Sequence, residues 1–112
     1  MADDDIYERL ADMSAGHERT DTRPTTVIGV FRVADFDHWA AGYAKAVAAD
    51  SALLGHRVWR SQDDPSTVMV AESFDSRSYA EAAWTHEATR EAMARDGIDL
   101  TSLRYTFYDE VG

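Results

Sequence analysis

The hydrophobic positions of this chain switch between the spacing of strands and the spacing of helices. Residues 25–33 are rich in β-branched side chains and apolar on both faces of an extended chain, with Val27 and Phe31 on one side and Ile28 and Val30 on the other. A strand that is apolar on both faces belongs in the middle of a sheet that is covered on both sides. Residues 25–33 therefore predict a central strand.

A helix is predicted next, because the apolar residues then recur every three or four positions. Asp35 is of a residue type that caps helix N-termini, and Leu53-Leu54-Gly55 places a glycine where helices commonly end. The apolar stripe between them is formed by Phe36, Trp39, Tyr43 and Val47.

The rest of the chain predicts two strands joined by a turn, a second helical region and a last strand. The strands are 56–61 and 67–74 around the turn 62–66, the helical region runs from Ser76 to Arg95 and stops at Gly97, and the last strand is 103–111. This order predicts an α+β ferredoxin-like sandwich, in which both helices cover one face of a four-stranded antiparallel sheet. A second copy of the sheet is the economical cover for the other face, so we expect a homodimer, a dimeric α/β barrel.

Residues 1–24 predict an acidic helical extension and linker ahead of the main domain, residues 25–112. Ile6, Leu10 and Met13 have the spacing of one helix stripe, and Gly16 can end that helix. So few apolar residues cannot hold a helix alone. The extension either docks on the main domain, within the chain or across a dimer, or frays.

Composition narrows the classes of function. The chain has 112 residues, a formal net charge of −10 and no cysteine. The negative charge disfavours nucleic acid and anionic membranes as partners, and the lack of cysteine excludes disulfides and thiolate chemistry. No apolar run reaches the roughly 20 residues of a membrane span, so we expect a cytoplasmic protein.

The stretch from Val33 to Tyr43, VADFDHWAAGY, concentrates aromatic, acidic and histidine side chains. Helical spacing turns His38 toward solvent, and the aspartates suit the first turn of a helix, so most of this segment is interpreted as a helix start. Trp39 and Tyr43 face the sheet. They are candidate pocket walls, although an ordinary core role is open to both.

The second helical region, which contains AAWTHEATREAM, supplies a candidate general base. In a continuous helix Tyr79 and His86 share the inner face and Trp84 points outward; a break near Thr85 would turn Trp84 inward. In both cases His86 lies near a helix start, where the dipole favours the neutral imidazole that a base requires.

The predicted strand 56–61 offers further candidates. His56 shares a face with Val58 and Arg60, while Trp59 takes the other face with Arg57. An arginine here could bind a carboxylate or enolate oxygen, and Trp59 could stack on a flat ring. No zinc-ligand spacing, phosphate loop or nucleophile elbow occurs, and no metal or other cofactor is expected.

Residues 25–111 resemble the dimeric α/β-barrel proteins related to antibiotic-biosynthesis monooxygenases, many of which are labelled cyclases. The matching segments are VADFDHWAAGY, VWRSQDDPSTVMVAESF and REAMARDGI. The resemblance implies the fold more strongly than an activity. Quinone-forming and haem-degrading branches of this superfamily use an asparagine on or near the first strand, whereas this chain has no asparagine.

The leading hypothesis is a cofactor-independent cyclase or isomerase acting on a small, flat, polyketide-like substrate in natural-product biosynthesis. His86 would be the base and His56 or Tyr43 the acid partner, and the substrate would contact Phe31, Trp39, Trp59, Arg60, Tyr79 and Trp84. The first alternative is a cofactor-free monooxygenase, which the missing asparagine disfavours. The second is a binding module without catalysis.

Overall fold

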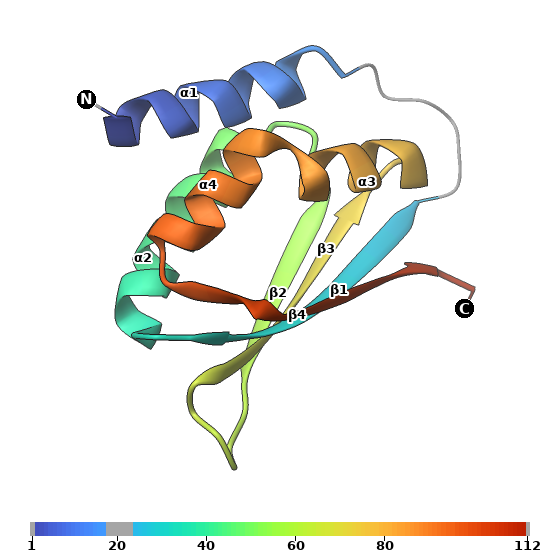
Figure 1. Ribbon diagram of the computed structural model, residues 1–112. Coiled ribbons are helices and arrows are strands. Elements are labelled where there is room, and N and C mark those ends of the chain that lie inside the picture. The colour runs from blue at the N-terminus through green and yellow to red at the C-terminus, as the bar shows by residue number, and fades with distance from the viewer. Residues whose placement is uncertain (1, 18–23, 112) are drawn as a thin grey trace.

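The computed structural model describes residues 2–17 and 24–111, and it confirms the ferredoxin-like fold. The elements are α1 (Ala2–Ala15), β1 (Thr25–Val33), α2 (Phe36–Ala49), β2 (Gly55–Arg60), β3 (Thr67–Phe74), α3 (Arg77–Thr85), α4 (Glu87–Arg95) and β4 (Ile98–Asp109). The four strands form one antiparallel sheet in the order β2-β3-β1-β4. Helices α2, α3 and α4 cover one face of this sheet, and α1 lies across the outside of the helical layer (Figure 1).

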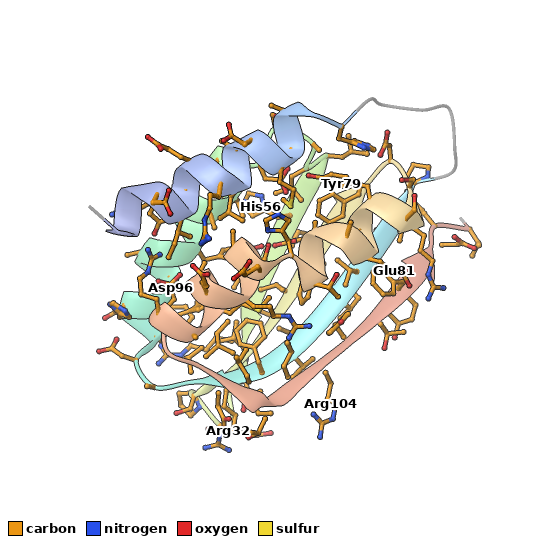
Figure 2. The ribbon with its side chains drawn as sticks, turned by 45° about the horizontal axis from the view of Figure 1, so that its top comes forward. Arg32, His56, Tyr79, Glu81, Asp96 and Arg104 are labelled. Carbon is orange, nitrogen blue, oxygen red and sulfur yellow. The ribbon has the colours of Figure 1, made fainter. Side chains whose placement is uncertain are left out.

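The alternation of side chains along the two central strands decides what each face of the sheet carries. Val27 and Phe31 of β1 and Val70 of β3 are buried under the helices. Their neighbours in sequence point to the face without helices, which we call the open face. Arg32 and Arg104 point away from the helices on that side (Figure 2).

The predicted helix ends are correct at one end of α2 and wrong at the other. Asp35 caps the N-terminus, and its carboxylate accepts the His38 amide hydrogen at 3.1 Å. The helix ends at Ala49, ahead of the predicted Leu53-Leu54-Gly55. The Asp50 carboxylate accepts the amide hydrogen of Ala52 at 2.9 Å, and this local hydrogen bond replaces the next helical turn.

The second helical region is interrupted, as one of the two sequence interpretations required. His86 has extended backbone angles, φ −60° and ψ 141°, and separates α3 from α4. The break turns Trp84 inward, where it is 3% exposed. The last strand begins at Ile98 instead of the predicted residue 103, because Ile98 and Asp99 pair with Val33 and Arg32 beyond an irregularity in the β1–β4 ladder.

The N-terminal helix docks on its own chain, which resolves the alternatives left open for it. Ile6 and Leu10 are buried against Ala88 and Ala92 of α4. Of the linker predicted to follow, residues 18–23 lie outside the described part of the chain. His17, which precedes them, bonds to the buried Asp75 at 2.6 Å. None of the helices described is long and apolar enough to cross a membrane.

Candidate functional site

Between the helices and the sheet lies a partly open cavity of about 90 Å³, which we call the inner cavity. Its walls are mostly apolar and aromatic. They include Phe31, Trp39, Tyr43, Val70, Phe74 and Trp84 from the sheet, α2 and α3, and Leu10 and Met13 from α1. Carboxyl groups also line it, those of Asp50, Glu72 and Asp96.

Among the side chains that line this cavity, Glu72 is the one best suited to acid–base chemistry. It lies on β3 with the same parity as the buried Val70 and Phe74, so its side chain points under the helices. The Tyr43 hydroxyl donates to one carboxylate oxygen at 2.7 Å, and the Trp84 indole N–H donates to the other at 3.0 Å. A carboxylate accepts about four hydrogen bonds, so these two donors leave acceptor positions free.

Burial raises the pKa of the Glu72 carboxyl, and the nearby charge of Asp50 raises it further, while the bonds from Tyr43 and Trp84 oppose the increase. A raised carboxyl pKa is the adjustment that general acid–base catalysis near neutral pH requires. The pKa of the Tyr43 hydroxyl is also raised, first by burial and then by Glu72, so Tyr43 stays protonated as a neutral donor.

The raised pKa of Glu72 predicts how stability depends on pH. The folded state binds the proton more tightly than the unfolded state, so the contribution of this carboxyl is complete below about pH 4.5 and is lost as pH rises through the raised value. We expect the free energy of unfolding of the wild type, relative to Glu72→Gln, to fall from acid to neutral pH. Urea unfolding of both proteins across this range measures the difference; a constant difference would contradict the raised pKa.

The break before α4 turns Trp84 toward the sheet and makes His86 the N-cap of α4. The Trp84 ring lies on β1 over Gly29, where an added Cβ would approach ring carbons Cη2 and Cζ3 to 2.5 and 2.9 Å. Nδ1 of His86 accepts the Ala88 amide hydrogen at 3.0 Å, which caps α4. In neutral His86 the ring proton is therefore on Nε2, and the residues that line the inner cavity do not include His86.

The other predicted site residues divide between the two faces of the sheet. Trp39 stacks on Tyr43, with ring centroids 4.9 Å apart, and Phe31 packs against Trp39. His56 lies edge-on to Tyr43, at 5.9 Å between centroids, and borders a more open groove of about 330 Å³ between α2 and β2. The structure thus brings together Phe31, Trp39, Tyr43, Trp84 and His56.

The remaining candidates lie outside this group. Tyr79 is buried under α3, where its hydroxyl donates to Asp50 at 3.4 Å, so it reaches the inner cavity through that carboxylate. Arg60 lies 4.2 Å over the Phe36 ring and donates to the Pro65 carbonyl near the β2–β3 turn. Trp59 is on the open face beside Arg57, as its strand parity predicted, and the sheet separates it from the inner cavity.

Sequence reasoning missed Glu72, although the signal was present. In β3 the inward positions carry Val68, Val70, Glu72 and Phe74, so one acidic residue interrupts an apolar face. Among residues 2–17 and 24–111 there is no group of three or more His, Cys, Asp or Glu side chains that could hold a metal ion. Proton transfer by Glu72 is the chemistry that this arrangement supports.

Comparison with solved structures shows the same fold in other proteins. No protein-family model matches the chain, and no curated protein gives a significant sequence match. SnoaB from Streptomyces nogalater, a cofactor-independent oxygenase, has a TM-score of 0.64 at 10% identity; the match covers 81% of this chain and 96% of SnoaB. A proposed antibiotic biosynthesis monooxygenase from Chloroflexus aurantiacus J-10-fl has a TM-score of 0.62 at 21% identity over 80% of this chain and 94% of the other.

A third protein, a proposed antibiotic biosynthesis monooxygenase from Bordetella bronchiseptica, has a TM-score of 0.65 at 12% identity. That match covers 81% of this chain and all of the other. At these identities the comparisons establish the fold, an antibiotic-biosynthesis-monooxygenase-like α+β sandwich, and leave the reaction to be argued from the site.

Proposed function

We propose that this protein is a cofactor-independent oxygenase that oxidises a small, flat, phenol-type aromatic in the inner cavity, with Glu72 as the general base. The observation that carries the proposal is a carboxylate with free acceptor positions inside an aromatic cavity. The fold shared with SnoaB, a cofactor-independent oxygenase, supports the same class of reaction. It favours oxidation over the cyclisation expected from the sequence.

The proposed reaction begins when Glu72 accepts a proton from the substrate. The electron-rich anion that results can reduce molecular oxygen directly, so the substrate supplies every electron. One ring methylene and one molecule of oxygen give one carbonyl and one molecule of water, so one oxygen atom is retained in the product and the other leaves as water. Trp39 and Trp84 provide flat walls for the ring, and positioning of this kind lowers the barrier further.

The pair formed by Tyr43 and Glu72 can take the place of the asparagine that this chain lacks. Quinone-forming members of the superfamily that this chain resembles use an asparagine on or near the first strand. This chain has none, and its inner cavity instead presents the Tyr43 hydroxyl and the Glu72 carboxylate. We infer that this pair recognises the substrate oxygen.

Oxygen uptake tests the proposal. We expect the protein, dialysed against chelator and free of flavin, to consume oxygen when supplied with anthrone or a hydroquinone, with one oxygen molecule used for each carbonyl formed from anthrone. Heat-denatured protein and buffer measure autoxidation. Oxygen consumption at the rate of autoxidation with the whole panel would exclude this activity.

A second candidate, the cyclase or isomerase, is supported by a specific pair of groups. Burial raises the pKa of Asp50 as well as that of Glu72, so two carboxyl groups of raised pKa line this cavity and can share the acid and base roles. Such a pair can move a proton between two substrate atoms without oxygen. Product formed under strict anaerobic conditions would favour this candidate over the oxygenase.

We also propose that the protein is a homodimer that pairs its open faces. Apolar side chains on this face are exposed in the single chain: Val30 is 37%, Trp59 38% and Tyr108 52% exposed. Light scattering at micromolar concentration should give twice the chain mass of 12.5 kDa. Val30→Asp should shift the equilibrium toward monomer, and a monomeric wild type would contradict the pairing.

A further inference from the structure

Helix α1 is part of the wall of the inner cavity. Leu10 and Met13 line it from above, opposite the sheet. Leu10 is 5% exposed, and Figure 1 shows α1 lying across the outside of the helical layer. Helix α1 packs on both α2 and α4 and so covers part of the inner cavity.

The contacts that hold α1 in place are polar at its edges. Arg9 pairs with Glu91 of α4, and the Tyr7 hydroxyl accepts from Arg95. At the other end the Ser51 amide donates to Ser14 Oγ at 3.0 Å. Water can replace each of these bonds, so separating α1 from the main domain costs chiefly the burial of Ile6 and Leu10, which is less than an element of the sheet would lose.

One of these connections, and one further contact just after α1, lead to acidic groups of the inner cavity. Arg95, which holds Tyr7, also pairs with Asp96 at 3.2 Å. His17, just after α1, packs at a tilt against the Tyr79 ring at 4.1 Å between centroids, and the Tyr79 hydroxyl donates to Asp50. A ligand that displaced Asp50 or Asp96 would therefore disturb the contacts that hold α1 on the main domain.

The inner cavity is smaller than most pockets for organic ligands, so part of its wall has to move when a ligand enters. Pockets for small organic ligands commonly measure about 300–1,000 Å³, several times the roughly 90 Å³ of this cavity. The solved neighbours are matched over 94% to 100% of their length by 80% to 81% of this chain. The unmatched fifth is the size of residues 1–24, the extension that contains α1.

We propose that α1 is a movable roof that determines which substrate the inner cavity accepts, with Met13 as the residue that limits ligand size. This proposal rests on the proposed function for the location of the substrate. Ligand binding requires α1 to lift and to close again over the aromatic ring, and the Met13 side chain then lies against the bound molecule.

Binding without oxygen tests this roof separately from catalysis. Anaerobic 2-naphthol and anthrone serve as probes with two and three fused rings. Binding is followed by quenching of tryptophan fluorescence in a Trp59→Phe background, where the remaining tryptophans, Trp39 and Trp84, both line the inner cavity. We expect Met13→Ala to tighten anthrone binding about tenfold relative to 2-naphthol, because the shorter side chain leaves room for the third ring.

Stopped-flow measurements of the association rates of the two probes are the second test of the movable roof. Glu91→Gln removes the charge that pairs with Arg9, and we expect it to raise the association rate of both probes several-fold. Glu81→Gln is the matched control, since Glu81 receives Arg77 within α3, well away from α1 (Figure 2). Its association rate should equal that of the parent.

The outcomes of these experiments test the role of α1 independently of the proposed oxygenase activity. Unchanged probe selectivity in Met13→Ala together with equal association rates in Glu91→Gln and Glu81→Gln would overturn the proposal that α1 is the roof. Probe binding that follows these expectations would support it even if no probe is oxidised in air, a result that counts against the oxygenase alone.

Discussion

The Glu72→Gln variant is expected to lose turnover by a factor of about 100 to 10,000, the range typical of a general base. Glutamine keeps the shape of the side chain and can still accept from Tyr43 or Trp84, but it cannot take up the substrate proton. The loss should appear mainly in kcat, with a smaller change in KM, because the aromatic walls are unaltered and the glutamine amide can still hydrogen-bond to the substrate oxygen. Steady-state oxygen uptake measures both constants.

Controls separate this effect from a change of structure. Glu81→Gln makes the same chemical change on the exposed surface of α3 and should keep wild-type turnover. The pH profile gives a second check. Because burial raises the pKa of Glu72, wild-type activity should increase with pH through a value above the ordinary 4.5 of a glutamate. Full turnover in Glu72→Gln would remove Glu72 from the mechanism.

Replacing Gly29 with alanine is expected to destabilise the fold by about 3 kcal/mol, the upper part of the usual range for overpacking a core. The new methyl group would lie 2.5 Å from Cη2 of Trp84. That ring cannot move outward easily, because it is 3% exposed and its N–H bonds to Glu72. Urea unfolding followed by circular dichroism measures the loss.

Two further variants show whether the cost arises from contact with Trp84. Gly55→Ala introduces the same methyl group on β2, where nothing lies within 4 Å, and should change stability by less than about 0.5 kcal/mol. In a Trp84→Phe background the smaller ring leaves room, so Gly29→Ala should cost less there. Equal costs in both backgrounds would place the strain elsewhere.

Much of the fold could be predicted because it depends on regular patterns of apolar residues. The strands predicted at 25–33 and 67–74 have the observed bounds, since turn residues or caps flank each of them. The end of α2 could not be predicted, because Asp50 leaves the helix to make a local hydrogen bond while its carboxyl lines the inner cavity. The docking of α1 was left open for a similar reason, since it depends on long-range contacts such as Ile6 with Ala88.

The candidate site was predicted less completely. The aromatic residues Trp39, Tyr43 and Trp84 were identified as candidates, because their spacing or a helix break turns them toward the sheet. Attention to histidines led away from Glu72, although its parity with Val70 and Phe74 marked it as an inward acid. The donors that surround it come from α2 and α3, residues 29 and 12 positions away in sequence. Their convergence is a property of the fold.

A crystal structure of the protein with a phenolic aromatic, such as 2-naphthol under anaerobic conditions, tests most directly whether the inner cavity is the active site. We predict the ring between Trp39 and Trp84, its hydroxyl within hydrogen-bonding distance of the Glu72 carboxylate, and α1 closed above it. A ligand bound on the open face of the sheet, or one in the inner cavity whose hydroxyl points away from Glu72, would contradict this account.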